Sequence, residues 1–485
     1  MSQSKPHIPI LRHGRPYQSL DALELKSAGT DTSVAVISQA NAGLIRKDIR
    51  NIGDAWSVLR SLSTDELIQI SNQAGEIFMH DSLSLGIGGE KQSPEDYILQ
   101  LSVTSCLPHT LVRRNMEKIH QVFTEMGSIV RGLTRGLDHS ILDHGIGKQA
   151  GSDICYYPVA KSLGVVLPSN SPGVNSIWMP CVILKIPVIL KPGRDEPWTP
   201  WRIIQAFIAA GCPAEAFGFY PTDHEGASAI LQTCDKSQLF GDSATTEPYA
   251  RNQAVQCHGP GWSKVLIGED TVDNWKKYID LFVQSIAANG GRSCINASQI
   301  ITPRHGREIA DYLAKELARL TPLPADDKHA VLAGFANPTL AEYIDQAITE
   351  ELKIPGAVDV SPLYRRSKQR CVKLHGVSFL HPTIIFCERP DHPLARREFL
   401  FPYASIVEVP QKQMMEYIGP TLAATALTSD NDWIDQLLCC PEIDRLNIGD
   451  IPTSHVDWDQ PHEGNLFEFL YRRRAIKNTV QTVAG

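Results

Sequence analysis

The chain has 485 residues, enough for two or three domains that each have a hydrophobic core. Apolar residues make up 42% and charged residues 21%, and the net charge of −8 argues against a nucleic-acid partner. Eleven cysteines without disulfide or metal-ligand spacing indicate reduced thiols and no metal site. Because no long apolar run and no targeting segment is evident, we expect a cytoplasmic protein with no membrane contact.

The first 150 residues divide into an arm and a helical region. Residues 1–45 are predicted to form a loosely structured arm. Residues 54–150 are predicted to be mostly helical, because Ser63 and Thr64 can cap a helix and apolar residues then recur at helical spacing.

From residue 154 onward, strands and helices are predicted to alternate. Apolar strands are expected at Leu163–Pro168, Pro187–Lys191 and Phe217–Tyr220. Helices are expected at Pro172–Ile186 and at Trp201–Ala210, the second after the helix start Thr199-Pro200 and before Gly211. Short connections between alternating elements predict a parallel, doubly wound sheet.

A second alternating region runs from residue 271 to 435. It opens with a predicted helix, Val272–Ala288, and its later strands include Thr383–Phe386 and Ser405–Val409. A hinge near 268–272 is expected to separate the two α/β units. The class predicted is therefore α/β with two large units.

Cys294 is the strongest candidate for a catalytic residue. It lies in Ala288–Ser298, a stretch of small residues, and a predicted strand, Ser298–Thr302, follows it. Glycines before a thiol leave the sulfur unshielded, and a loop held by rigid structure is how nucleophiles are presented. The alternative is a buried, inert cysteine.

Three further segments place polar groups where a catalytic or nucleotide-binding site would need them. Asn170, between Pro168 and Pro172, is either a turn residue or a donor to an oxyanion. Lys191, at the end of a strand, is either solvated or close to a nucleotide. Asp242 is either a simple helix cap or part of an anion-binding turn at Phe240–Thr245, as helix starts favour anions.

Two other segments are harder to interpret from residue chemistry alone. Glu398, in Arg396–Pro402, would by itself be one more surface carboxylate. His258, in Cys257–Ile267, is either a general base with a suitable imidazole or only a packed polar residue.

Together and in their order along the chain, over roughly residues 150–470, these segments resemble the aldehyde dehydrogenase superfamily. The resemblance implies an NAD- or NADP-dependent oxidoreductase in which Cys294 attacks an aldehyde and Asn170 holds the oxyanion. It further implies that the lysine contacts the adenosine ribose and the glutamate the nicotinamide ribose. The residues it assigns to the cofactor are Pro168, Lys191, Arg194, Ser243 and Glu398.

The resemblance also predicts the domain organisation. Residues 1–150 would be an arm and helical lead-in, 151–270 the dinucleotide-binding domain, and 271–435 the catalytic domain. Residues 436–485 would return to the first domain and form a small oligomerisation element, so a homodimer or homotetramer is expected. Pocket walls are expected from the helical region near 110–135, from Trp178 and Trp262, and from the loop before Leu466.

Several positions depart from the family pattern. Asn296 replaces an alanine, Gly241-Asp242 replaces Thr-Gly, and Phe401 replaces a glycine. Arg194 stands where NAD-preferring members have a glutamate, so a 2′-phosphate and hence NADP would be acceptable. His258 stands where hydrolytic members have the glutamate that activates water.

The missing glutamate leaves three hypotheses open. The first, which the absence favours, is an acylating enzyme that passes the acyl group to or from coenzyme A and needs no activated water. The second is a hydrolytic enzyme that oxidises an aldehyde to the acid, with His258 or a relocated carboxylate as base. The third is a catalytically weakened family member with a binding or structural role. The substrate would be a small aldehyde or acyl thioester.

Overall fold

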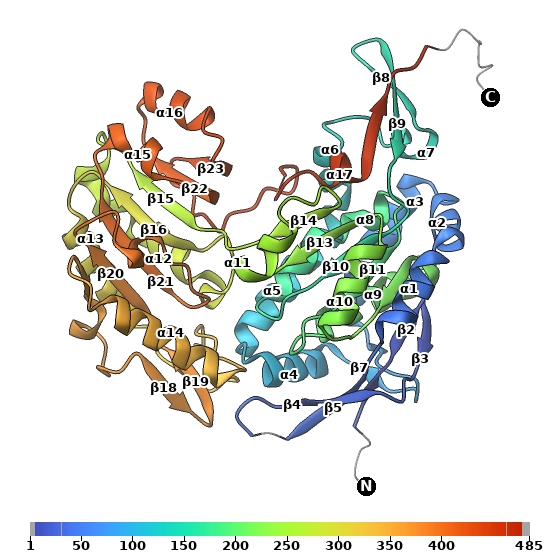
Figure 1. Cartoon of the computed structure of the whole chain (residues 1–485), viewed down its shortest axis with the longest axis horizontal. Helices are drawn as coiled ribbons and strands as arrows, with labels where there is room; N and C mark the ends of the chain where they lie inside the picture. The colour runs from blue at the N-terminus through green and yellow to red at the C-terminus, as the bar shows by residue number, and fades with distance from the viewer. Residues whose placement is uncertain (1–4, 31, 462, 478–485) are drawn as a thin grey trace.

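The computed structural model describes residues 5–30, 32–461 and 463–477. Two lobes lie side by side, each built on a seven-stranded sheet flanked by helices (Figure 1). The predicted α/β class with two large units is therefore confirmed.

The first sheet is parallel except at one edge. In spatial order its strands are β14 (Val255–His258), β13 (Lys236–Phe240), β10 (Leu163–Val166), β11 (Val188–Lys191), β12 (Phe217–Phe219), β2 (Ile10–Arg12) and β3 (Arg15–Tyr17). Strands β10 to β14 run parallel, whereas β2 and β3 are antiparallel. From β10 the chain moves to β11 and β12, then crosses back to β13 and β14, so β10 and β13 flank a topological switch point.

The N-terminal segment corrects one prediction, because it is not a loose arm. Two of its strands extend the first sheet, and three others form a separate sheet in the order β1 (His7–Ile8), β5 (Ser33–Ser38) and β4 (Ala22–Lys26). These strands are only two to six residues long, too short for a clear periodic pattern in the sequence.

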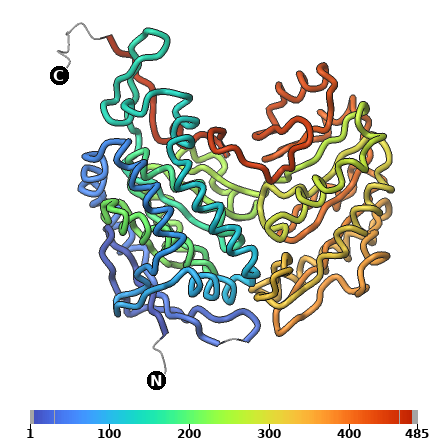
Figure 2. The backbone as a smooth tube through the Cα atoms, turned by 180° about the vertical axis from the view of Figure 1, so that it is seen from behind, coloured from blue at the N-terminus to red at the C-terminus, as the bar shows by residue number. Residues whose placement is uncertain are grey.

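Helices lie on both faces of the first sheet (Figures 1 and 2), and most of residues 54–150 is helical as predicted. The N-terminal helices are α1 (Ala42–Arg50), α2 (Gly53–Arg60), α3 (Thr64–His80), α4 (Pro94–Ser105), α5 (His109–Thr124), α6 (Met126–Leu133) and α7 (Ser140–His144), with a hairpin of β6 (Leu83–Ser84) and β7 (Lys91–Gln92). The later elements are α8 (Pro180–Ile183), α9 (Trp198–Ala209), α10 (His224–Thr233), α11 (Ser243–Thr246) and the 3₁₀ helices η1 (Pro172–Ile177), η2 (Ala214–Ala216) and η3 (Glu247–Tyr249). Ser63 caps α3 together with Glu66.

Two predicted helices differ in detail from the observed ones. The segment Pro172–Ile186 is not one helix but a 3₁₀ helix followed by a single turn, since Pro180 begins α8 separately. Helix α9 begins at Trp198 and not after Thr199-Pro200.

The second lobe repeats the layered arrangement. In spatial order its strands are β17 (Ala357–Asp359), β20 (Thr383–Cys387), β21 (Tyr403–Glu408), β16 (Ala297–Thr302), β15 (Ser263–Ile267), β22 (Thr421–Leu427) and β23 (Ile443–Ile448). Its helices are η4 (Val272–Tyr278), α12 (Ile279–Ala287), η5 (Ala288–Gly291), α13 (Gly306–Leu317), α14 (Pro338–Glu351), η6 (Ser361–Leu363), η7 (Pro393–Arg396), α15 (Gln411–Tyr417) and α16 (Asn431–Leu438). A hairpin of β18 (Cys371–Leu374) and β19 (Val377–Leu380) lies at one end.

The crossing between the lobes comes earlier than the predicted hinge at 268–272. Strand β14 belongs to the first sheet and β15 to the second, so the chain crosses between His258 and Ser263. Strand β23 extends the second sheet past residue 435. Strands β14 and β23 have only four and six residues, and so short a run does not tell which of two sheets a strand joins.

The last described segment runs from the second lobe back to the first (Figures 1 and 2). It ends in α17 (Leu466–Leu470) and β24 (Tyr471–Arg474), and β24 pairs with β9 (Ser152–Pro158), which pairs with β8 (Ile146–Gln149). The expected oligomerisation role and the homodimer or homotetramer remain predictions.

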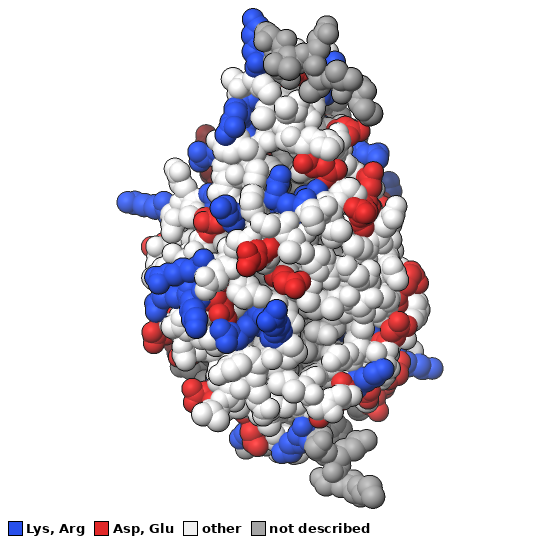
Figure 3. Space-filling model, turned by 90° about the vertical axis from the view of Figure 1, so that its right-hand side faces the viewer, with Lys and Arg blue, Asp and Glu red and all other residues white. Residues whose placement is uncertain are grey.

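The outer face of the first lobe carries both signs of charge. Figure 3 shows Lys and Arg side chains interspersed with Asp and Glu, so this face presents no single sign of charge. None of the helices in the described ranges combines the length and apolar content that crossing a bilayer requires.

Candidate active site

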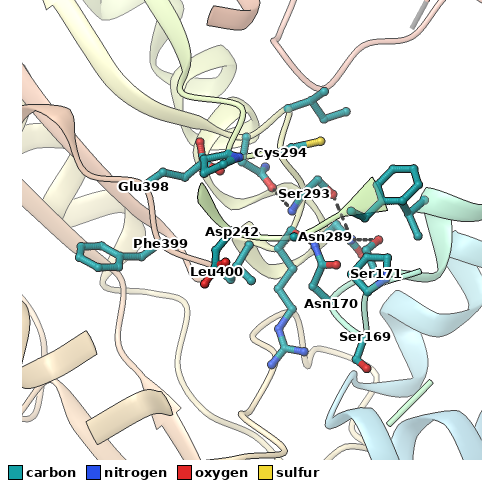
Figure 4. A pocket seen from close by; sticks show the side chains of 18 of the residues that line it. Ser169, Asn170, Ser171, Asp242, Asn289, Ser293, Cys294, Glu398, Phe399 and Leu400 are labelled. Atoms are coloured by element: carbon teal, nitrogen blue, oxygen red, sulfur yellow. Dashed lines mark hydrogen bonds between the residues drawn. The ribbon is translucent and has the colours of Figure 1, made fainter. Parts of the chain in front are cut away.

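A cavity of about 940 Å³ is lined by residues of both lobes. Six predicted site residues are on its wall: Pro168, Asn170, Ser243, His258, Cys294 and Glu398. Figure 4 shows Ser293 and Cys294 on one loop, with Asn170 and Ser171 approaching from another. The other two, Lys191 and Arg194, are not among the lining residues, and Arg194 is exposed.

The cysteine loop has a backbone that requires its glycines. Asn289, Gly290 and Gly291 all have positive φ values, of 52°, 67° and 71°. A Cβ at Gly291 would lie 2.4 Å from the backbone of Phe401, so only glycine fits there. A Cβ at Gly261 would lie 2.0 Å from the carbonyl oxygen of Cys294, so that glycine lets the crossing segment pack against the loop.

Two asparagines hold the loop in place. Asn296, which replaces the family's alanine, accepts a hydrogen bond from the Ser293 N–H at 2.8 Å. Its amide donates to the carbonyls of Ser285 and Ala288. Asn289 donates to Ser171 at 3.0 Å, which joins the cysteine loop to the loop that carries Asn170. The departure at Asn296 therefore has a structural role.

The thiol of Cys294 is held mainly in its neutral form. Burial raises its pKa, the nearby carboxylates Glu463 and Glu398 raise it further, and Lys118 lowers it. The thiolate is the nucleophile, so reactivity is expected to depend on a base or on high pH.

We expect alkylation of Cys294 by iodoacetamide to accelerate with pH up to at least about pH 9, because a thiol with a raised pKa gains thiolate only at alkaline pH. The rate is measured on the Cys294 peptide by mass spectrometry, which separates it from the other cysteines. A rate that is already constant below about pH 7 would contradict this expectation.

Asn170 is bound to the cysteine loop. Its side-chain amide donates to the carbonyl oxygen of Arg292 at 2.9 Å. An amide nitrogen carries two hydrogens, so one donor remains after this bond. Its buried Oδ1 has no hydrogen-bond partner among the described residues.

His258 lies against a carboxylate that sequence reasoning missed. Its Nδ1 is 2.5 Å from Oε2 of Glu463, and both side chains are largely buried. The imidazole ring stacks on Phe240 with ring centroids 4.4 Å apart, which fixes its plane. Both members of the pair line the cavity with Cys294. Glu463 lies in the loop before Leu466, which was expected only to supply a pocket wall.

Glu398 is engaged by the backbone of the crossing segment. Its carboxylate accepts hydrogen bonds from the N–H groups of Gly261, at 3.1 Å, and of Trp262. Burial raises the pKa of Glu398 to about 7. The carboxylate of Glu398 is therefore held by backbone N–H groups of the described residues. The predicted contact with the nicotinamide ribose would come in addition to these bonds.

The strand ends of the first sheet fit a dinucleotide. Pro168, Lys191 and Gly241 follow or end β10, β11 and β13, the carboxyl edge where nucleotides bind in doubly wound sheets. A Cβ at Gly193 would lie 2.4 Å from the carbonyl oxygen of Pro168, so this edge is closely packed. Asp242 caps α11 by accepting from the Thr245 N–H at 2.9 Å, which is the simple-cap alternative.

The expected pocket walls are present with one exception. Leu111, Arg114 and Lys118 of α5 and also Trp262 line the cavity. Trp178 does not line it, because this tryptophan is fully buried and donates to Asn175. Within the described ranges, no group of three His, Cys, Asp or Glu side chains is placed to hold a metal ion.

The sequence profile of the Aldehyde dehydrogenase family matches residues 106–429, and the chain therefore belongs to that family. It is 24% identical over 330 residues to N-succinylglutamate 5-semialdehyde dehydrogenase of Chromohalobacter salexigens, a match that covers 64% of this chain and 58% of that protein. It is 22% identical over 282 residues to putative succinate-semialdehyde dehydrogenase [NADP(+)] 2 of Mycobacterium bovis, covering 55% and 50%. The chain thus spans between half and six-tenths of these relatives' lengths.

A solved structure supports the fold. The NAD⁺ complex of aldehyde dehydrogenase from Bacillus cereus has a TM-score of 0.77 at 16% identity, with 96% of each chain covered. The predicted aldehyde dehydrogenase-like fold is thereby confirmed.

Proposed function

We propose that this protein oxidises an aldehyde to the carboxylic acid with NAD⁺ or NADP⁺, through a thioester on Cys294 that water hydrolyses. The observation that carries the proposal is the shared cavity, in which a cysteine nucleophile, an amide donor and a histidine–carboxylate pair come together. Family membership supports the same reaction class.

In the first half-reaction, the thiol of Cys294 loses its proton to solvent, the sulfur forms a bond to the aldehyde carbon, and the carbonyl oxygen becomes an oxyanion. The remaining amide N–H of Asn170 and a backbone N–H of the loop would stabilise that oxyanion. A bound NAD(P)⁺ supplies the hydride acceptor. Once the hydride has left the carbon and the C=O bond has reformed, a thioester remains on Cys294.

In the second half-reaction, His258 would accept a proton from water as the water attacks the thioester carbon. Glu463 would orient the ring and stabilise the imidazolium that forms, as a carboxylate 2.5 Å from Nδ1 can do. The C–S bond then breaks, the acid leaves, and the proton returns to the Cys294 sulfur.

The cofactor would lie along the strand ends of the first sheet. Pro168 and Ser243 line the cavity there, and Glu398 lies across it. Lys191 and the exposed Arg194 do not line the cavity, so they would contact the adenosine end of the cofactor from outside it. Arg194 keeps NADP acceptable, because a guanidinium can pair with a 2′-phosphate.

Transfer to coenzyme A, which the missing glutamate favoured at first, is not supported by the comparisons. The absence of a glutamate at position 258 no longer argues against hydrolysis, because Glu463 places a carboxylate beside His258. A hydrolytic reaction therefore does not lack a base.

The test is steady-state NAD(P)H formation with a panel of aldehydes, with each dinucleotide, in the presence and absence of coenzyme A. We expect continued turnover without coenzyme A, with one acid formed per reduced cofactor. Turnover that stops after one equivalent per site unless coenzyme A is added would overturn the hydrolytic proposal.

A further inference from the structure

One wall of the cavity carries two cations on the same face of α5. Arg114 and Lys118 are four residues apart, so their side chains leave the helix on one side. Both line the cavity that contains Cys294. The adjacent Arg113 faces elsewhere and pairs with Glu95 at 2.7 Å.

Neither cation of this wall has a hydrogen bond or an ion pair with any other residue in the described ranges. Lys118 extends toward Gly173 at the start of η1, where an added Cβ would lie 3.6 Å from Nζ. Burial lowers the pKa of Lys118, with an opposing effect from Cys294. A partly desolvated ammonium without an anion is unfavourable, so the site is suited to a ligand that supplies one.

Of the four described carboxylates on the cavity wall, three contact other groups of the protein, and the fourth, Asp195, interacts electrostatically with Arg194, Lys191 and Arg292. Glu463 lies beside His258, Glu398 accepts from two backbone N–H groups, and Asp242 caps α11. Arg445, a further cation that interacts with Cys294 and Glu463, donates to the carbonyl oxygen of His455 at 2.6 Å. The α5 wall is thus left with positive charge that the described residues do not neutralise by contact.

We propose that Lys118, assisted by Arg114, binds the carboxylate of an aldehyde substrate whose carbonyl group lies at Cys294. The preferred substrates are then short aldehydes with a carboxylate at the other end, that is, semialdehydes. This inference rests on the proposed function. It competes with one other role for Lys118, stabilisation of the Cys294 thiolate, which would serve every aldehyde equally.

The test compares kcat/KM for aldehydes of equal length that end in a carboxylate or in its uncharged amide. The wild type should prefer the carboxylate, and Lys118→Met should lose about 10- to 100-fold of that preference, the usual worth of a charge-assisted hydrogen bond. Lys118→Arg should keep most of the preference. Lys412→Met, an exposed lysine on α15, is the matched control and should behave as wild type.

A second measurement does not depend on turnover. Glutarate, a dicarboxylate probe, should slow alkylation of Cys294 by iodoacetamide in the wild type and in Lys118→Arg, but not in Lys118→Met. An equal loss for both aldehydes, together with slower alkylation of Cys294 without glutarate, would assign Lys118 to the thiolate and overturn the proposal. If the wild type oxidises no aldehyde at all, the proposed function fails, and protection by glutarate still decides whether Lys118 binds a carboxylate.

Discussion

Cys294→Ala is expected to reduce aldehyde oxidation on the order of 10⁴-fold or more, because Cys294 carries the only thiol among the described residues that line the cavity. Both half-reactions depend on the C–S bond, so neither a burst nor steady formation of NAD(P)H should remain. The measurement is stopped-flow detection of the reduced cofactor under single-turnover and multiple-turnover conditions.

The control for this substitution is Cys371→Ala, which removes a half-buried thiol from β18, outside the cavity lining. It should keep wild-type kinetics. Binding of NAD(P)H, followed by fluorescence, should persist in Cys294→Ala and so exclude loss of folding. Retention of more than about a tenth of the wild-type rate would rule out Cys294 as the nucleophile.

His258→Ala is expected to separate the two half-reactions. Loss of a general base typically slows the affected step by about 10²- to 10⁴-fold, so steady-state turnover should fall by that factor. The burst of about one NAD(P)H per site should remain, because attack by Cys294 and hydride transfer come before the step that needs activated water.

Glu463→Gln should also slow the steady state but by less, because the imidazole would remain while the charge beside it is lost. The matched control is His224→Ala, since His224 is an exposed histidine at the start of α10. If the first equivalent of NAD(P)H is lost along with turnover in His258→Ala, the histidine acts before the thioester and not in its hydrolysis.

The architecture could be predicted because its signals are local. Strand–helix alternation after residue 154 predicted six of the parallel strands, and apolar spacing predicted the helices before it. The strands of residues 7–38 were missed because runs of only two to six extended residues leave no clear periodic pattern. The crossing between the lobes, at His258–Ser263, was predicted too late in the chain. Which sheet a strand joins depends on strand pairing in the folded protein, which the local sequence does not reveal.

The candidate site was predictable where each residue belongs to a short motif. Cys294, Asn170 and Ser243 come together in the cavity because their loops lie between the two sheets. Glu463 could not be found in this way, because it lies far from His258 in the chain and belongs to no local sequence motif that indicates a catalytic role. Lys118 was missed for a similar reason, because a lysine on an amphipathic helix is expected to face solvent. Only the packing of α5 against η1 places its side chain at the cavity.

The most direct test of a hydrolysed thioester on Cys294 is intact-protein mass spectrometry of His258→Ala, quenched after the burst with aldehyde and NAD(P)⁺. The proposal predicts that the protein gains the mass of one acyl group, that the adduct maps to Cys294, and that it decays slowly to the free acid without coenzyme A. An unmodified His258→Ala protein that still forms one NAD(P)H per site would contradict the proposal. So would an adduct that only coenzyme A removes, both from this variant and from the wild type.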